Sequence, residues 1–163
     1  MRNGAKNSEV LISYAHSDAG EAGFVNALAK QLESFGVGTI AAPVAGATKF
    51  DEQLRDALTK CSLLLVVLTP KSLESPAVNF EIGAALGQGK KVVPLYPSAK
   101  TMRSGAARPF RYLQGIEVER QSPAEVAKRI ANMVAESSQE HGQRELQKFW
   151  GALRSSSGVT ELD

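Results

Sequence analysis

The chain has 163 residues, of which 43% are hydrophobic and 22% are charged, and it carries a formal net charge of +2 at pH 7. These values suit one globular domain with a packed core, and they exclude an intrinsically disordered chain. The near balance of 19 basic and 17 acidic residues gives no reason to expect nucleic acid as a direct partner.

The cysteine content and the hydropathy of the sequence indicate which cellular compartment to expect. Cys61 is the single cysteine, so an internal disulfide and a structural zinc site built from several thiols are both excluded. No run approaches the roughly 18–20 apolar residues that a bilayer-spanning helix needs. The first nine residues contain no apolar signal core. We therefore expect a cytoplasmic protein that does not contact a membrane.

The first predicted unit is a strand followed by a helix. Residues 9–14 form a short apolar run that ends in a polar cluster at 15–20, as expected of a buried strand and a turn. Asp18 and Glu21 have the spacing of a helix capping box, which assigns a capping role to Glu21. Apolar residues then recur at near-helical intervals, namely Phe24, Leu28, Leu32 and Phe35.

The same unit repeats along the chain. Residues 63–68 contain no polar side chain, which is typical of a central strand that is covered on both faces. The other strands are predicted at 37–42, 91–96 and 115–119, the last of them at an edge of the sheet. Because strands and helices alternate throughout, we predict an α/β fold with a central five-stranded parallel sheet and right-handed crossovers.

Three helices are predicted between these strands and after them. One carries Phe50, Leu54 and Leu58, and a second begins at the favourable cap Ser75 and ends near residue 87 or 89. The third begins at residues 122–125, which combine a cap, a first-turn proline and a capping-box glutamate.

Two segments do not follow the alternation. Residues 97–112 contain several basic side chains and no acid, which indicates a solvated loop or, alternatively, a phosphate contact. The last segment has an apolar stripe at helical spacing, formed by Leu146, Phe149, Trp150 and Leu153. This stripe either docks on its own domain or awaits a partner. We place a domain at residues 1–137 and an amphipathic helix with a tail at 138–163.

A carboxylate beyond the central strand is the main candidate for chemistry. Ligands of open parallel sheets bind beyond the carboxyl ends of the strands, and residues 69–81 follow the central strand. Glu81 lies six residues after Ser75, in the second helical turn and too deep to be a cap. Small neighbours leave a notch around it, and the helix dipole is expected to keep it ionised at the helix surface. The alternative is an ordinary solvated glutamate.

Other common catalytic arrangements lack their sequence signals. The chain contains no Gly-x-x-x-x-Gly-Lys phosphate loop and no Gly-x-Gly-x-x-Gly fingerprint, so ATP hydrolysis and dinucleotide redox chemistry are not indicated. His16 is not accompanied by a nucleophile-elbow sequence, and we interpret it as a loop residue.

Several of these segments together resemble a bacterial Toll/interleukin-1 receptor (TIR) domain of the NAD-cleaving type. Residues 10–14, followed by Ser17 and Asp18, are similar to the first conserved box of that family. Residues 43–50 lie where the family has its ligand-gating BB loop. The hydroxyl-rich stretch that ends in the family's acid is matched by Thr69, Ser72, Ser75 and Glu81. The resemblance implies a flavodoxin-like, three-layer fold.

The resemblance also implies an activity and a site. In the enzymatic TIR domains the acid is the catalytic glutamate of an NAD+ glycohydrolase, which places that role on Glu81. The implied substrate-binding residues are Ser13, Tyr14, Ala15, Pro43, Phe50, Thr69, Ser72 and Ser75. NAD+ is the substrate, and no cofactor or metal is implied. Two positions depart from the family, since Ala77 stands where many members have tryptophan and Thr69 where many have serine.

The chemistry of NAD+ explains how one carboxylate can suffice. Most glycosidases need a second carboxyl group to protonate the leaving oxygen. Nicotinamide leaves as a neutral molecule because its ring nitrogen begins with a positive charge. The site therefore has to stabilise an oxocarbenium-like ribose carbon, and an ionised carboxylate suits that task. ADP-ribose would then be released in linear or cyclic form.

The resemblance implies partners and also leaves alternatives. TIR enzymes act as self-associating effectors, often with a sensor domain or partner protein, and the implied setting is prokaryotic defence or virulence. One alternative is a non-catalytic TIR interaction module. Another is an enzyme like the nucleoside deoxyribosyltransferases, which residues 80–85 and 89–92 also resemble.

Overall fold

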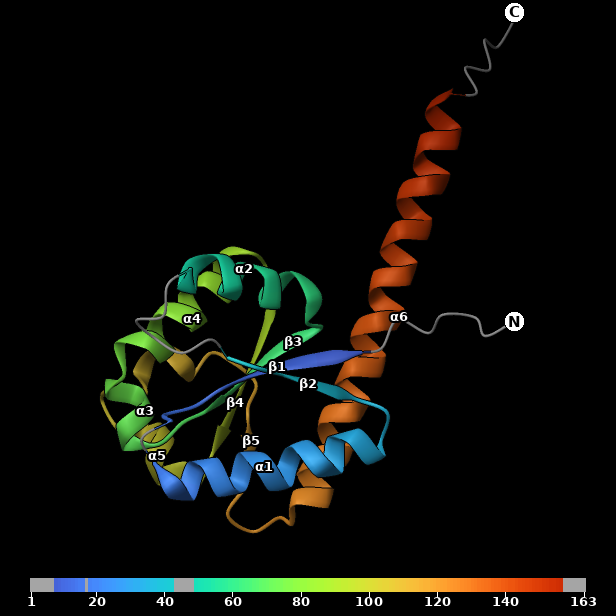
Figure 1. The fold of residues 1–163 in the computed structure, drawn as a ribbon. Coiled ribbons are helices and arrows are strands. Elements are labelled where there is room, and N and C mark those ends of the chain that lie inside the picture. The colour runs from blue at the N-terminus through green and yellow to red at the C-terminus, as the bar shows by residue number, and fades with distance from the viewer. Residues whose placement is uncertain (1–7, 17, 43–48, 157–163) are drawn as a thin grey trace, which may run out of the picture.

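A five-stranded parallel sheet forms the centre of the molecule (Figure 1). The computed structural model describes residues 8–16, 18–42 and 49–156. The strands are β1 (Glu9–Ser13), β2 (Gly38–Ala41), β3 (Leu63–Val67), β4 (Lys91–Tyr96) and β5 (Ile116–Glu117). Their order across the sheet is β2-β1-β3-β4-β5, and every neighbouring pair is parallel. The predicted fold class and the edge position of the last strand are confirmed.

Helices cover both faces of this sheet. They are α1 (Ala19–Ser34), α2 (Phe50–Lys60), α3 (Pro70–Glu74), α4 (Pro76–Gly87), α5 (Ala99–Arg103) and α6 (Pro123–Ser156), with a 3-10 turn η1 (Arg108–Phe110). Buried side chains of α1 and α6 share one core with one face of the sheet, and those of α2 and α4 share the other. Figure 1 shows the three layers, with α1 and the first half of α6 on one side and α2 and α4 on the other.

The central strand β3 confirms the prediction that its run of apolar residues is covered on both faces. Leu63, Leu65 and Val67 belong to the core with α1 and α6. Leu64 and Val66 belong to the core with α2 and α4. All five side chains are buried, which explains why no polar residue interrupts the strand.

Helix starts follow the predicted caps, with one exception. The Asp18 carboxylate accepts hydrogen bonds from the backbone N–H groups of Gly20 and Glu21, at 2.9 and 3.1 Å. Ser122 and Glu125 bond reciprocally before α6, as a capping box does. The capping role predicted for Glu21 is wrong, because its carboxylate points into the protein and bonds elsewhere.

The segment 97–112 is more structured than predicted. It contains α5 and η1, and Phe110 is buried in the core beside α2 and α4. The guanidinium of Arg111 donates to the carbonyl oxygens of Met102 and Arg103, each at 2.7 Å. These bonds occupy Arg111 and order the segment. Most of its described residues are exposed, as predicted, but α5 and η1 were not predicted.

Helix α6 changes its surroundings along its length. Val126, Ile130 and Val134 are buried against the sheet and α1. From Ser138 onward, every residue whose side chain is described is exposed, and the helix projects away from the domain (Figure 1). The predicted division at 137 and 138 therefore falls inside a continuous helix, at the point where packing ends. The structure does not show the stripe docked on its own domain.

None of the described helices combines the length and the hydropathy that crossing a bilayer requires.

Candidate active site at the carboxyl ends of β1 and β3

The direction of the chain across the sheet changes between β1 and β3. From β1 the chain moves outward to β2, then returns to the other side of β1 and continues through β3 to β5. Helices on opposite faces diverge at such a point and leave a crevice beyond the strand ends, where open α/β sheets bind ligands. Ser13 ends β1 beside Val66 of β3, and Thr69 lies two residues after the end of β3.

Glu81 comes to this crevice from α4. It lies in the buried stripe of that helix, with Val78, Ile82 and Ala85 at helical spacing, and it is 3% exposed. The prediction of a carboxylate at the helix surface is therefore wrong. Glu81 occupies a position where the helix otherwise places apolar side chains against the sheet, and this spacing was visible in the sequence.

Two buried oxygen atoms at this place lack hydrogen bonds. Among the described residues, the Ser13 hydroxyl oxygen and the Oε2 atom of Glu81 have no partner. Ser13 is fully buried. Native proteins satisfy the great majority of buried polar atoms, and each unsatisfied one costs about 1–3 kcal/mol. An unsatisfied serine and carboxylate at a switch point form a polar site that a ligand or water can complete.

Burial also changes the acidity of Glu81. Loss of solvent around the carboxylate raises the pKa of Glu81 above its usual value of 4.5. The Ser13 hydroxyl partly opposes this rise in pKa, which shows that it lies near the carboxylate, although the two atoms do not have hydrogen-bond geometry. The helix dipole was expected to favour the ionised form of Glu81, whereas burial shifts the pKa in the opposite direction. Dipole effects fade after the first turn, and Glu81 lies in the second.

A second buried carboxylate lies beside the same strand ends. Glu21 of α1 is 5% exposed, and its Oε2 atom accepts a hydrogen bond from the backbone N–H of Ala15 at 2.7 Å. The Thr69 hydroxyl donates to its Oε1 atom. Glu21 therefore ties the turn after β1 to the turn after β3. Its place in the buried stripe with Val25, Leu28 and Leu32 was the sequence signal for this role, and the capping interpretation missed it.

Most of the predicted hydroxyl groups serve local structure. The Thr69 N–H donates to the Ser72 hydroxyl at 2.7 Å, and the Ser72 N–H donates to the Thr69 hydroxyl at 3.2 Å, which forms a capping box for α3. The Ser75 hydroxyl accepts from the Val78 N–H at 3.4 Å and caps α4. These caps orient the two helices that lead to Glu81. Ser13 is the predicted hydroxyl that faces the carboxylate.

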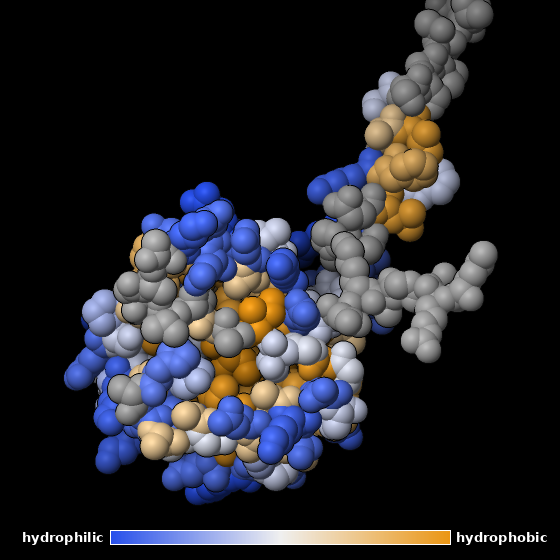
Figure 2. All heavy atoms as spheres, in the orientation of Figure 1, coloured by the Kyte–Doolittle hydropathy of each residue, from blue (hydrophilic) through white to orange (hydrophobic). Residues whose placement is uncertain are grey.

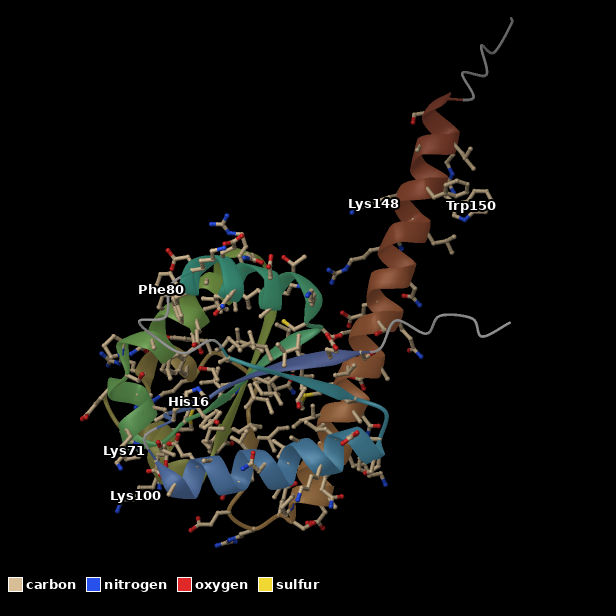
Figure 3. The ribbon with its side chains drawn as sticks, in the orientation of Figure 1. His16, Lys71, Phe80, Lys100, Lys148 and Trp150 are labelled. Carbon is tan, nitrogen blue, oxygen red and sulfur yellow. The ribbon has the colours of Figure 1, made fainter. Side chains whose placement is uncertain are left out.

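Two aromatic pairs lie on elements that flank the ends of β1 and β3. The rings of Tyr14 and His16 lie 4.2 Å apart, directly after β1. Phe50 of α2 packs on Phe80, the residue before Glu81, with ring centroids 5.9 Å apart. The predicted residue Pro43 lies outside the described residues. Figure 3 shows His16 and Phe80 at the end of the sheet where the strands finish.

An ion pair lies at the edge of the site, which we call its rim. The described residues do not form a metal site. Lys71 of α3 pairs with Asp18 at 3.5 Å, close to the start of α1 (Figure 3). No group of three or more histidine, cysteine, aspartate or glutamate side chains within the described ranges is arranged to hold a metal ion. What the described site offers a ligand is a carboxyl group, a hydroxyl group and aromatic surfaces.

A family model for the TIR domain matches residues 10–134. The chain belongs to the TIR domain family. This match covers all of the sheet except Glu9, the first residue of β1, and it includes Ser13, Glu21 and Glu81. It ends at Val134, the last buried residue of α6. No curated protein matches the chain.

Solved structures show the same fold at low sequence identity. The TIR domain of a Toll-related receptor from Hydra magnipapillata is 19% identical, with a TM-score of 0.50 and coverage of 65% of this chain and 82% of that one. A CMP N-glycosidase from Clostridium botulinum is 18% identical, with a TM-score of 0.54 and coverage of 76% and 98%. A diflavin flavoprotein from Nostoc sp. is 14% identical, with a TM-score of 0.56 and coverage of 83% and 98%.

Proposed function

We propose that this TIR domain is an NAD+ glycohydrolase that cleaves the bond between nicotinamide and ribose, with Glu81 as its catalytic carboxylate. The observation that carries the proposal is the buried pair of unsatisfied oxygens, Ser13 Oγ and Glu81 Oε2, at the switch point of the sheet. A ribose with its hydroxyl groups supplies both donors and acceptors, so it can satisfy both atoms at once.

The raised pKa of Glu81 fits a cationic substrate. An ionised carboxylate without a partner is unfavourable in a buried position, and the positive nicotinamide ring of NAD+ would offset that cost. Binding would therefore favour the ionised form of Glu81 at the moment when its charge is needed. Few other common metabolites bring a fixed positive charge next to a ribose carbon.

The reaction needs no acid for the leaving group. The C1′–N bond breaks, its electron pair stays on the ring nitrogen, and nicotinamide departs neutral. The developing positive charge on C1′ and the ring oxygen is stabilised by the Glu81 carboxylate. Water then attacks C1′ and loses a proton, which gives ADP-ribose. A nucleophile within ADP-ribose gives a cyclic product instead.

Assembly is part of the proposal. We infer that copies of this domain associate through TIR–TIR contacts and that a sensor domain or partner protein gathers them, as in an effector of prokaryotic defence. Phe50 of α2 packs on Phe80 of α4, the residue before Glu81, so a neighbouring copy that contacts this aromatic pair would lie close to the site.

The test is an assay of the purified chain with NAD+, at concentrations below and above the onset of self-association measured by light scattering. Nicotinamide release is followed by chromatography, and the second product is identified by mass. CMP and a deoxynucleoside are run as comparison substrates because they separate NAD+ cleavage from other N-glycosyl chemistry. We expect NAD+ to be consumed faster than either, with a rate that rises more than linearly with protein concentration.

The decisive variant is Glu81→Gln, with Glu74→Gln as its matched control on the neighbouring helix α3, where Glu74 is exposed. Both changes replace a carboxylate with an amide of the same size. We expect Glu81→Gln to lose a factor on the order of a hundred or more, as preorganised charges usually contribute, and Glu74→Gln to keep the parental rate. A folded Glu81→Gln protein with the parental rate contradicts the assignment. The absence of NAD+ cleavage in the assembled parent favours a non-catalytic interaction module.

A further inference from the structure

The distal half of α6 carries an apolar face that lies outside the TIR domain. The side chains of Leu146, Phe149 and Trp150 are 56%, 58% and 53% exposed, and Leu153 continues the same face. Figure 2 shows apolar atoms gathered on this part of the helix, beyond the domain. The Phe149 and Trp150 rings meet edge to face, with centroids 5.9 Å apart. A contiguous apolar patch of this kind on a protein surface marks an interaction site.

The spacing of this face is two-fold symmetric. The face begins and ends with a leucine, and two residues separate each leucine from the central Phe149–Trp150 pair. The apolar positions therefore have the same spacing in either chain direction. On an α-helix the two leucines lie almost in line, about 10 Å apart along the axis, with one aromatic side chain on each side of that line. When such a face is turned end over end against its own copy, each apolar side chain lies opposite an apolar side chain.

We propose that this face pairs two copies of the chain through an antiparallel contact between their α6 helices. Leu146 of each copy would lie opposite Leu153 of the other, and the aromatic side chains would meet around the two-fold axis. Such an isologous contact repeats each interaction twice, which is the usual way in which homodimers form. In this register a second copy covers the whole apolar face with apolar side chains and places no polar residue opposite it, which is why we take a second copy as the occupant.

The surroundings of the face agree with this arrangement. Lys148 extends from the other side of the helix than Trp150 does (Figure 3). Arg144 pairs with Glu140 on its own helix at 3.7 Å, so this cation is not directed into the apolar face. In the antiparallel pair, Ser156 of the second copy would lie opposite Gln143, which is beyond Val134, the last buried residue of α6. The paired part of α6 would therefore lie beyond the part that packs on the domain.

The small size of the apolar face limits the expected affinity of the contact between the two α6 helices. Two turns of paired helix bury less than the roughly 1,200 Å² that stable interfaces need, even with aromatic side chains that bury about 150–250 Å² each. We expect a dissociation constant on the order of micromolar or weaker. A weak contact of this kind forms when copies are already concentrated, and it strengthens an assembly that is also held by its domains. The proposal stands without the NAD+ activity.

The first experiment compares Phe149→Glu with Gly151→Glu by sedimentation velocity over a concentration series. Both variants add one negative charge within the same turn, but residue 151 lies on the opposite side of the helix, where an added Cβ meets no atom within 4 Å. We expect Gly151→Glu to self-associate like the parent, and Phe149→Glu to need at least tenfold more protein for the same dimer fraction. Circular dichroism confirms that both variants are folded. Equal self-association of Phe149→Glu and the parent overturns the proposal.

The second experiment reports the direction of the pairing independently of contacts between the domains. Leu146→Cys and Leu153→Cys proteins are oxidised separately and as a mixture, and the buried Cys61 contributes little background. In the antiparallel pair, only the mixture brings two thiols within the Cα separation of a disulfide, which is roughly 4.4–6.8 Å. We therefore expect the crosslinked dimer only in the mixture. Crosslinking of each variant alone shows a parallel contact, and no crosslinking in any sample shows that the face does not pair with a second copy, so either result contradicts the proposal.

Discussion

Two buried glutamates lie at the same end of the sheet, and they differ in what surrounds their carboxylates. Glu21 is bonded by the Ala15 N–H and the Thr69 hydroxyl, so it joins the turns after β1 and β3. Glu81 is equally buried, but its Oε2 atom has no partner among the described residues, and the nearby Ser13 hydroxyl is also unsatisfied. Both side chains replace an apolar residue in the buried stripe of a helix.

The difference between the two sites distinguishes structural from chemical roles. A satisfied buried carboxylate stabilises the geometry that its hydrogen bonds define. An unsatisfied one lowers the stability of the free protein, and it persists where a ligand gains from it. The predictions below test this division, from the largest expected effect to the smallest.

The largest effect expected on stability is the opposite response of the two sites to the same substitution. Glu21→Gln puts an amide, with only one acceptor oxygen, where two donors point, so we expect the free energy of unfolding to fall by about 1–3 kcal/mol. Glu81→Gln removes a buried charge and should raise the free energy of unfolding at pH 7. Urea denaturation of both variants measures the two changes. Destabilisation of equal size in both variants would refute the distinction between a structural Glu21 and a chemical Glu81.

Ser13→Ala should affect catalysis more than folding. The hydroxyl has no partner in the free protein, so its removal relieves an unsatisfied atom and should leave the unfolding free energy equal to or above the parental value. In the complex the same hydroxyl would bond to the substrate or to Glu81. We expect the rate of NAD+ cleavage to fall by about tenfold, which corresponds to one neutral hydrogen bond of about 1.4 kcal/mol. A clear loss of stability with an unchanged rate would make Ser13 a structural residue.

The pH dependence of stability should expose the raised pKa of Glu81. Because its folded pKa is above its usual value of 4.5, the folded state binds more protons in the interval between the two values. The contribution of Glu81 to stability is therefore present below pH 4.5 and is lost as the pH rises through the folded pKa. We expect the advantage of Glu81→Gln over the parent in thermal melting to be present at neutral pH and to disappear below pH 4.5. A difference that is constant across this range would contradict the raised pKa.

The smallest effect is expected at the rim of the site. Lys71 and Asp18 form an exposed ion pair at 3.5 Å, and such pairs contribute about 0–1 kcal/mol. Lys71→Ala should therefore change the unfolding free energy within this range, and the change should shrink in high salt. A larger, salt-independent loss would show that the rim contributes to the packing around Glu21.

Much of the fold was predictable because local spacing reflects burial. The apolar run at residues 63–68 predicted a strand covered on both faces, which is β3, and Ser75 and Ser122 marked the starts of α4 and α6 correctly. The ordered turns within segment 97–112 were not predicted, because Arg111 binds carbonyl groups eight and nine residues away. A basic composition does not reveal such bonds.

The sequence by itself determined the alternation of strands and helices, the likeness to TIR domains and the selection of Glu81 as the candidate catalytic carboxylate. These follow from periodicity and motif spacing, which are properties of neighbouring residues along the chain. Only the tertiary structure decided that Glu81 is buried and opposite Ser13, and that Glu21 is a bridge and not a cap. The physical reason is that the environment of a carboxylate depends on desolvation and on partners from other elements, such as Thr69, which follows Glu21 by 48 positions.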